Sequence, residues 1–355
     1  MVKDFWRDRR VLLTGHTGFK GAWAALWLEA LGADVTGLAL APEPGKSLFN
    51  MLSPWKQLKS HLCDIRDATT TRLNVLESEP EIVIHMAAQS LVRRSYRKPL
   101  ETLATNIMGT SNLLQALLEL PVKPQAIIIV TSDKVYQNND SGRAFNEDDR
   151  LGGDDPYSAS KACTEMVTHA FRESYFKANS SQLASARAGN VIGGGDWSED
   201  RLIPDLIRSI EHKTPFVLRN PNATRPWQHV LDVISGYFTY IEALIIDQET
   251  PLALNFGPTR ANNLSTAEIV RKLGEAIGTS IINKISSQTL ECKEKEKQLL
   301  SIDATRATET LGWKPRLSIQ ESLQWTAAWY RSYLEGKDMR AFSLAQLNQF
   351  ESLTL

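Results

Sequence analysis

Residues 10–21, Arg10-Val-Leu-Leu-Thr-Gly-His-Thr-Gly-Phe-Lys-Gly21, decide what fold this sequence predicts. An apolar run leads into Gly-x-x-Gly-x-x-Gly, and residues 22–31 continue in helix-forming alanine, leucine and tryptophan, so the order is strand, turn, helix. In such a unit Gly15 lets the chain turn, Gly18 lets backbone approach a pyrophosphate, and Gly21 lets the helix pack closely. The helix N-terminus adds N–H groups and positive partial charge. The stretch predicts a dinucleotide-binding turn, with a tight turn that binds no ligand as the alternative.

Further apolar runs follow at a spacing typical of alternating strands and helices. Near-continuous apolar runs are expected where strands are covered on both faces of a parallel sheet. We predict an α/β fold, a Rossmann-type doubly wound parallel sheet. The expected strands are residues 34–40, 81–85, 125–131 and, more weakly, 181–188, and the expected helices are residues 67–78, 99–120 and 156–177.

After residue 190 the pattern changes to a glycine-rich loop followed by short elements. We expect helices at 203–211 and 233–246, small strands at 215–218 and 227–230, a strand at 253–257 and a solvated charged loop at 293–297. The predicted division is a dinucleotide-binding domain (1–190 plus 231–257), a smaller, partly helical C-terminal substrate lobe (191–230 and 258–340) and a peripheral tail (341–355), either a helix or frayed.

Composition excludes several classes of protein. The 355 residues include 40 Lys plus Arg and 41 Asp plus Glu, a formal net charge of -1, so we expect no nucleic-acid partner and no membrane partner. Cys63, Cys163 and Cys292 lie far apart, which is typical of reduced thiols and predicts neither a disulfide framework nor a metal site. The charged first ten residues resemble no signal peptide, and no run of about 18 apolar residues follows, so we expect a cytoplasmic protein.

Tyr157 and Lys161 stand four residues apart in Pro-Tyr-Ser-Ala-Ser-Lys, which places both side chains on one helix face. There the ammonium of Lys161 can favour the phenolate of Tyr157, whose ordinary pKa of roughly 10 is too high for a base at neutral pH. A tyrosine prepared in this way can take a proton from an alcohol while hydride leaves its carbon. Alone the spacing also fits an ordinary surface helix, but the glycine turn makes that alternative weak.

Six strings together carry a resemblance to a known family. The chain resembles the extended short-chain dehydrogenases/reductases from about residue 8 to residue 335, most closely the CDP-glucose 4,6-dehydratases. The strings are Thr-Gly-His-Thr-Gly-Phe-Lys-Gly (14–21), His-Met-Ala-Ala-Gln (85–89), Thr-Ser-Asp-Lys-Val-Tyr (131–136), Pro-Tyr-Ser-Ala-Ser-Lys (156–161), Arg-Ala-Gly-Asn-Val (187–191) and Arg-Pro-Trp-Gln-His-Val (225–230). Related dTDP-glucose dehydratases have Asp-Glu where this chain has Asp133-Lys134, and this departure favours the CDP-sugar branch.

The resemblance implies a reaction and the residues that perform it. Tyr157, with its pKa lowered by Lys161 and by the nicotinamide charge, takes the proton of the sugar 4-hydroxyl, which Ser132 holds. Hydride passes from C4 to NAD and later returns to C6. Asp133, protonated, gives its proton to the departing C6 hydroxyl. Lys134 is either the base that removes the C5 proton, for which it must be neutral, or the group that stabilises the enolate.

The resemblance also implies binding sites. Arg225 is the best candidate for the diphosphate of a nucleotide-sugar, with Asn190 and Arg201 as weaker candidates, because guanidinium groups match phosphate oxygens. A structural salt bridge is the alternative for both arginines. The predicted NAD contacts are Gly15, Thr17, Gly18, Phe19, Lys20, Gly21, Asp64, Ile65, Ala87, Ala88, Gln89, Asn106, Tyr157 and Lys161.

Some alternatives stay open. The ribose-binding acid expected about 20 residues after the glycines is not obvious, so NAD and NADP are only weakly distinguished. Asp64 fits a helix cap as well as an adenine contact. The resemblance implies conversion of CDP-D-glucose to CDP-4-dehydro-6-deoxy-D-glucose, for deoxysugar (O-antigen or lipopolysaccharide) synthesis, in a homodimer or homotetramer. A sugar-nucleotide 4-epimerase, another NDP-hexose 4,6-dehydratase and a non-catalytic dinucleotide sensor are the alternatives; Asp133 argues against the epimerase.

Overall fold

The centre of the protein is a seven-stranded, wholly parallel sheet. The structure, a computed structural model, describes residues 3–179, 181–218, 220–258, 263–278, 285–286 and 297–353. In spatial order the strands are β11 (Ala253–Phe256), β6 (Gln182–Ala188), β5 (Ala126–Val130), β4 (Ile82–His85), β1 (Arg10–Thr14), β2 (Asp34–Ala39) and β3 (Leu58–Leu62). This order confirms the predicted Rossmann-type, doubly wound α/β fold.

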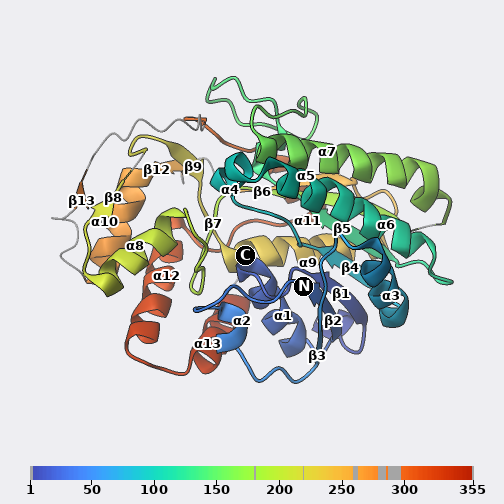
Figure 1. The fold of residues 1–355 in the computed structure, drawn as a ribbon, viewed down its shortest axis with the longest axis horizontal. Helices are drawn as coiled ribbons and strands as arrows, with labels where there is room; N and C mark the ends of the chain where they lie inside the picture. Colours follow the sequence, from blue (N-terminus) through green and yellow to red (C-terminus); the bar gives the residue numbers. More distant parts are fainter. Residues whose placement is uncertain are drawn as a thin grey trace.

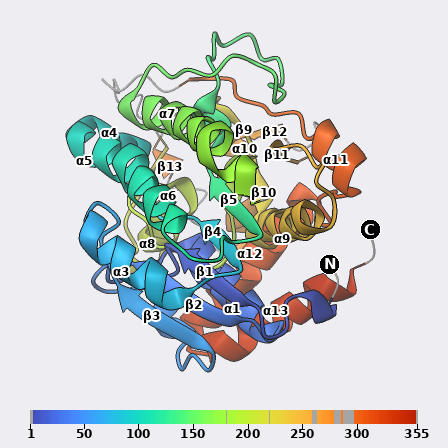
Figure 2. The same ribbon diagram turned by 90° about the vertical axis from the view of Figure 1, so that its right-hand side faces the viewer.

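Helices cover both faces of the sheet (Figures 1 and 2). Alternate residues of one strand enter opposite cores, as in β1, where Val11 and Leu13 belong to one buried cluster and Leu12 to the other. One face packs against α3 (Ala68–Ser78), α6 (Thr110–Leu118) and α7 (Pro156–Phe171), and the other against α1 (Phe19–Ala30) and α9 (Val230–Ile246). Burial on both faces explains why these strands are apolar at successive positions.

Two predicted helices are interrupted, and one strand of the central sheet was not foreseen. The expected helix 99–120 is α5 (Pro99–Leu103), a π-helical segment (Ala104–Gly109) and α6, and α7 likewise passes into a π-helical segment (Arg172–Phe176) and a short 3₁₀ turn (Lys177–Asn179). The weak candidate 181–188 is β6, buried throughout. The missed strand is β3, a largely exposed edge strand with the polar sequence Leu-Lys-Ser-His-Leu, which lacks an apolar run.

The remaining elements gather beyond the carboxyl edge of the sheet, at the left of Figure 1. The expected strand at 227–230 is wrong in extent, because β10 covers two residues and α9 already begins at Val230. Three two-stranded pairings join β7 to β10, β9 to β12 and β8 to β13. The bounds are α8 (Leu202–His212), α10 (Thr266–Ile277), α12 (Ile319–Leu334), β7 (Val191–Ile192), β8 (Phe216–Val217), β9 (Thr224–Pro226), β10 (Gln228–His229), β12 (Asn263–Ser265) and β13 (Ile285–Ser286).

Four more helices complete the fold: α2 (Leu48–Met51), α4 (Val92–Arg97), α11 (Thr305–Leu311) and α13 (Met339–Ser352). The tail was predicted to be either a helix or frayed. It forms α13, a helix that packs onto α1. The Trp27 Nε1 atom donates to Glu351 Oε1 at 2.9 Å, and Phe350 is fully buried against the same indole. Among the described residues, no helix has the length and apolar character that crossing a membrane requires. The predicted loop 293–297 falls outside the described residues except for Lys297, which pairs with Asp154 at 2.8 Å.

Candidate active site

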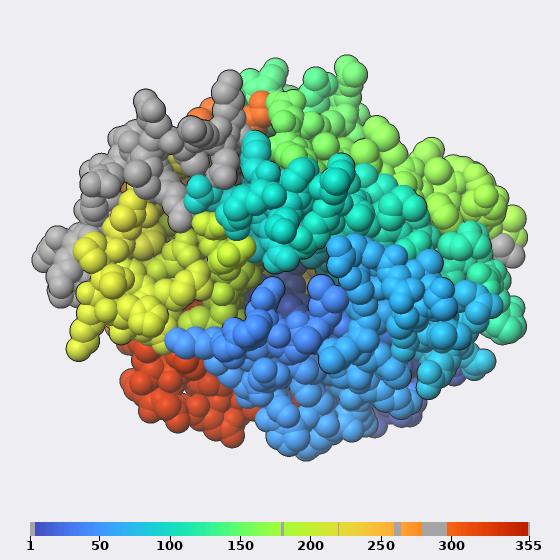
Figure 3. Space-filling model, viewed as in Figure 1, coloured from blue at the N-terminus to red at the C-terminus, as the bar shows by residue number. Residues whose placement is uncertain are grey.

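A cleft of about 830 Å³ lies at the carboxyl edge of the parallel strands. In the space-filling view the surface is hollowed where the blue, teal and yellow-green segments meet (Figure 3). Every predicted site residue lines this cleft except Asn106 and Lys161, which are buried just behind it. Residues that are up to about 200 positions apart in the sequence therefore share one cavity, as expected for ligand sites of open α/β sheets.

The glycine turn forms one wall of the cleft. Gly15 has φ +78°, and a Cβ there would stand 2.8 Å from the Ala87 nitrogen. A Cβ on Gly21 would stand 2.0 Å from the Gly15 carbonyl oxygen, so only glycine fits where α1 crosses the turn. Gly18 is the N-cap of α1 and offers no side chain to the first helical N–H groups. This wall is a backbone cradle that suits a pyrophosphate.

Replacing these glycines by alanine should separate packing from ligand approach. Gly21→Ala forces the turn apart, so we expect its free energy of unfolding to fall by about 1–3 kcal/mol and dinucleotide affinity to fall with it. Gly18→Ala, whose Cβ would meet its nearest neighbour at 3.4 Å, should leave stability nearly unchanged and weaken the dinucleotide alone. Denaturant unfolding and a fluorescence titration with NAD measure the two effects. Equal loss of stability in both variants would contradict this assignment.

The end of β4 forms the next part of the cleft. The Thr14 hydroxyl accepts hydrogen bonds from the Met86 and Ala87 nitrogens at 3.1 and 3.0 Å, so it holds the chain after β4 against β1. Asn106, on the π-helical segment, brackets Gln89 by accepting from its nitrogen at 2.8 Å and donating to its oxygen at 3.0 Å. Asn106 therefore shapes the predicted cofactor wall of Ala87, Ala88 and Gln89 from behind rather than lining it.

Asp64 and Ile65 line the opposite end of the cleft, beyond β3. Asp64 binds Arg66 through both carboxylate oxygens, and this partner holds the pKa of Asp64 below its usual range. The helix-cap alternative for Asp64 is wrong, because the cap of α3 is Asp67, which accepts from the Thr69 and Thr70 nitrogens. Beyond β2, Glu43 reaches the cleft on an exposed loop, so the end of that strand carries no buried acid.

Tyr157 and Lys161 lie on the first turns of α7. The helix begins at Pro156 after Asp155, whose carboxylate accepts from the Tyr157 and Ser158 nitrogens, and this cap fixes the angle at which Tyr157 enters the cleft. Tyr157 is 7% exposed and lines the cleft. The Lys161 ammonium lies behind it and donates to the Val130 carbonyl at 3.1 Å.

The expected lowering of the tyrosine pKa by Lys161 needs correction. Burial raises the pKa of Tyr157 in this chain, and the charge that chiefly opposes burial is that of Lys134, followed by a hydrogen bond with Ser132. Burial also lowers the pKa of Lys161 to about 8. In the chain alone, Tyr157 is therefore a neutral phenol at neutral pH, and further positive charge must enter the cleft before it becomes a base.

Ser132, Asp133 and Lys134 follow β5 and line the cleft together with Tyr157. Asp133 is 1% exposed; its Oδ1 accepts from the Ser132 hydroxyl at 2.9 Å and lies 3.4 Å from Lys134 Nζ. Its Oδ2 is buried and accepts no hydrogen bond from the described residues, and it lies 3.3 Å from where a Cβ on Gly189 would stand. Lys134 Nζ also lies 3.4 Å from Asn190 Oδ1. A buried carboxylate with one unused oxygen beside a phenol is an arrangement suited to proton transfer.

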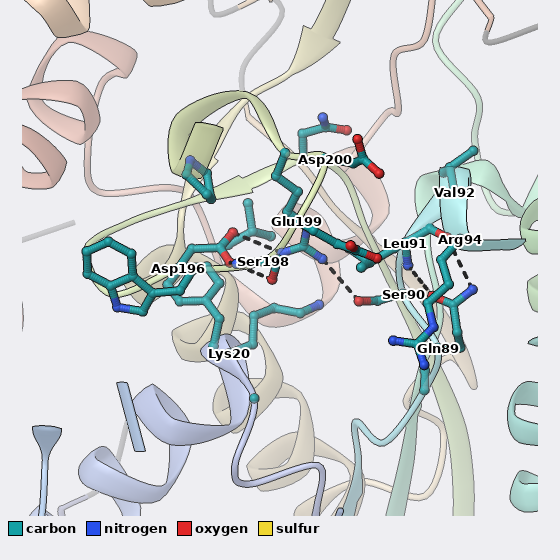
Figure 4. A pocket seen from close by; sticks show the side chains of 18 of the residues that line it. Lys20, Gln89, Ser90, Leu91, Val92, Arg94, Asp196, Ser198, Glu199 and Asp200 are labelled. Carbon is teal, nitrogen blue, oxygen red and sulfur yellow. Dashed lines mark hydrogen bonds and ion pairs between the residues drawn. The ribbon is translucent and has the colours of Figure 1, made fainter. Parts of the chain in front are cut away.

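Lys20 brings a further positive charge to this point from α1. Burial, together with the charges of Lys161 and Arg201, lowers the pKa of Lys20 to about 7, against the opposing charge of Asp133. Figure 4 shows its side chain reaching toward Asp196 and Ser198. The two histidines near the turn contact neighbouring hydroxyls: His85 bonds Thr14 and Thr110, and burial lowers its pKa to about 3, while His16 bonds Ser60.

The predicted substrate residues lie on the far wall of the cleft. Arg225 is 4% exposed and donates to the Thr224 and Gln298 carbonyls, which aims its guanidinium along β9. Arg201 donates to Asp196 at 3.0 Å and, across the cleft, to Ser90 at 3.1 Å. Arg201 therefore forms the salt bridge that the sequence left open as an alternative, and Trp197 and Trp227 also line the cleft.

A set of ion pairs spanning the cleft was not foreseen. Arg93 and Arg97 of α4 each bind Asp200 at 3.1 Å, and Arg97 also binds Glu199 at 2.9 Å. Figure 4 shows Ser90 on one side of the cleft and Asp196, Ser198, Glu199 and Asp200 on the other. These pairs join α4 to a loop roughly 100 residues later in the chain, and no local pattern in the sequence indicates such a pairing.

The amino-acid sequence of the chain is similar to those of known proteins. A sequence model described as GDP-mannose 4,6 dehydratase matches residues 12–326. The chain belongs to this dehydratase family. It is 41% identical to a CDP-glucose 4,6-dehydratase of Salmonella typhimurium over 99% of both chains. It is 30% identical to a dTDP-glucose 4,6-dehydratase of Streptomyces griseus, covering 91% of this chain and 94% of the relative.

Solved structures of other proteins have the same fold as this chain. A dTDP-glucose 4,6-dehydratase from Streptomyces venezuelae, with NAD and TYD bound, superposes with a TM-score of 0.78 at 23% identity and covers 93% of this chain and 99% of that one. The fold and the family assigned from sequence are thus confirmed, whereas the roles of individual residues stay predictions.

Proposed function

We propose that this protein is a CDP-glucose 4,6-dehydratase that converts CDP-D-glucose to CDP-4-dehydro-6-deoxy-D-glucose and water. The observation that carries the proposal is the unpartnered Oδ2 of Asp133, buried beside Tyr157 in the cleft that also holds the glycine turn. An alcohol oxidation needs only the phenol and a dinucleotide, whereas loss of a C6 hydroxyl also needs an acid. The 41% identical relative supports the choice of the cytidine nucleotide.

The cofactor we assign to the glycine wall is NAD. The steric limits at Gly15 and Gly21 and the open helix N-terminus match a dinucleotide, and structural relatives were solved with NAD. When bound, NAD supplies an acceptor for the C4 hydride and returns it to C6. Tyr157 takes the proton of the 4-hydroxyl, Ser132 orients that hydroxyl, Lys134 either takes the C5 proton or stabilises the enolate, and Asp133 gives a proton to the leaving hydroxyl.

The nucleotide part of the substrate lies, in this proposal, against the lobe of residues 191–230 and 258–340. Arg225 binds the diphosphate, with Asn190 and Arg201 as further candidates for this contact. Cytoplasmic location and a homodimer or homotetramer remain predictions; exposed Leu100 on α5, Met108 on the π-helical segment and Met166 on α7 support association of copies. A 4-epimerase is the second candidate, and the buried carboxylate of Asp133 disfavours it because epimerisation expels no hydroxyl.

The test is turnover of CDP-glucose with NAD present at much less than one equivalent. We expect a 4-keto sugar, detected by its alkaline absorbance, in amounts that exceed the NAD many times. UDP-, GDP- and dTDP-glucose serve as matched controls and should react far more slowly. Reduced cofactor formed in proportion to product, or CDP-galactose as the product, would replace this assignment with a simple dehydrogenase or an epimerase.

A further inference from the structure

Glu165 is a buried carboxylate on α7 to which no role has been given above. Its side chain is 4% exposed, and both oxygens are used. Oε1 accepts from the Thr131 hydroxyl at 2.5 Å, and Oε2 accepts from the Ser185 hydroxyl at 2.7 Å and from Arg187 at 2.8 Å. These donors, with the charge of Arg187, hold the pKa of Glu165 below its usual range despite burial, so it is ionised at neutral pH.

The position of Glu165 connects it to the reacting groups in two ways. Tyr157, Lys161 and Glu165 follow one another at four-residue intervals on α7, so they lie in a row on one helix face, about one turn apart. Thr131, which binds Glu165, immediately precedes Ser132 and Asp133. One carboxylate therefore touches the strand end that carries the proposed acid and lies one turn from the lysine behind the proposed base.

We propose that Glu165 is a positioning residue for the dehydratase reaction, which keeps Lys161 protonated behind Tyr157 and anchors the end of β5 beside Asp133. The inference rests on the proposed function. It does not make Glu165 a catalytic residue, because Glu165 does not line the cleft.

The charges around Lys161 explain why a counter-charge is needed. Burial lowers the pKa of Lys161, and Glu165 is the charge that acts in the opposite direction. The other groups facing this region come from every neighbouring element: Lys20 on α1, His85 on β4, Asp133 and Lys134 after β5, Arg187 on β6 and Tyr240 on α9. Arg187 is cationic and pairs with the same carboxylate, so removing the charge of Glu165 takes away the counter-charge of Lys161 but leaves the positive charge of Arg187.

The sign of the effect follows directly. Lys161 supports the reaction in its protonated form, so activity should fall as pH rises through its pKa. Glu165→Gln keeps the shape but removes the charge, which lowers the pKa of Lys161 and moves this alkaline limb to lower pH. We expect a displacement of about 1–2 pH units, and a rate loss of about tenfold near pH 8 that largely disappears under acidic conditions.

Three comparison variants make the test specific to charge. Glu165→Asp retains the charge and should leave the limb near its wild-type pH, even if the rate falls. Arg187→Gln removes the positive charge that pairs with Glu165, so it should move the alkaline limb to higher pH. This variant supplies the test if Glu165→Gln does not fold. The double variant should lie between the two single ones. Because Arg187 also binds the Tyr136 hydroxyl and the Glu147 carbonyl, the position of the limb is compared rather than the rate.

A structural role alone would lower the rate equally at every pH, or move all limbs in one direction, and either result overturns the proposal. The test of Glu165 also needs a measurement that does not depend on the proposed function. Protein labelled with ¹³C at lysine Cε gives the pKa of Lys161 directly by NMR, with Lys161→Met identifying the resonance. Wild type that forms no 4-keto sugar from CDP-glucose refutes the function, whereas an unchanged Lys161 titration in Glu165→Gln refutes the role of Glu165.

Discussion

Tyr157→Phe is expected to lower kcat for CDP-glucose by about 10³- to 10⁴-fold and to stop the reaction before any oxidation. In the proposed mechanism this phenol takes the proton of the sugar 4-hydroxyl, and it lines the cleft with a hydrogen bond to Ser132 and Lys134 nearby. Phenylalanine keeps the ring and its packing but cannot accept a proton. In a single turnover with excess enzyme, no absorbance of reduced nicotinamide should appear.

Tyr240→Phe is the matched control for loss of a buried phenol. Tyr240 is fully buried on α9, and its hydroxyl donates to the Pro251 carbonyl, away from the cleft. It should cost stability and leave the rate of oxidation almost unchanged. Substrate affinity should change little in Tyr157→Phe, as measured by calorimetry with CDP-glucose. Rapid oxidation in that variant, with a block only at a later step, would contradict the role of Tyr157.

Asp133→Asn should show the opposite behaviour, with normal oxidation and an overall rate lower by about 10²- to 10³-fold. Asparagine keeps the size of the side chain. Its oxygen can still accept from Ser132 and Lys134, the two residues that contact Oδ1 of Asp133 in the wild type. What it loses is the proton that the unpartnered Oδ2 would give to the C6 hydroxyl. Reduced nicotinamide should therefore build up in a stopped-flow experiment instead of passing transiently.

Solvent exchange at C5 separates Asp133 from Lys134. If Asp133 acts only on the leaving hydroxyl, Asp133→Asn in D₂O should still place deuterium at C5 of recovered CDP-glucose, as seen by NMR. Lys134→Met should oxidise the sugar and lose this exchange if Lys134 is the C5 base. Loss of exchange in Asp133→Asn, with exchange kept in Lys134→Met, would reverse the two assignments.

The fold was predictable from sequence wherever a strand is buried on both faces. β1, β4 and β5 are apolar runs, and the glycine turn identifies β1 as the strand that leads into α1. β3 escaped prediction because an edge strand needs no apolar run, and α4 because a six-residue helix with three arginines has no apolar period. The π-helical segment at Ala104–Gly109 was not predicted; at its end a Cβ on Gly109 would stand 2.6 Å from the Ile65 side chain.

The candidate site was predictable as far as motifs extend. Glycines, strand ends and the Tyr-x-x-x-Lys spacing bring the right residues to one cleft, because the carboxyl ends of parallel strands share an edge. The electrostatics were not predictable in the same way. That Lys134 rather than Lys161 chiefly opposes the burial of Tyr157 depends on side-chain placement, as do the pairs from Arg93 and Arg97 to Asp200. Glu165, one turn after Lys161, could have been found by extending the four-residue spacing once more.

The docking of α13 onto α1 has a consequence for how the protein is made. Trp27 finds its hydrogen-bond partner 324 residues later in the chain. At about 5–20 residues per second, a ribosome needs roughly 16–65 s to synthesise that length. Throughout this time the indole and the apolar surface around it lack their cover, so the nascent chain presents a surface for chaperones. Removing the segment that carries Phe350 and Glu351 should therefore lower the soluble yield during expression.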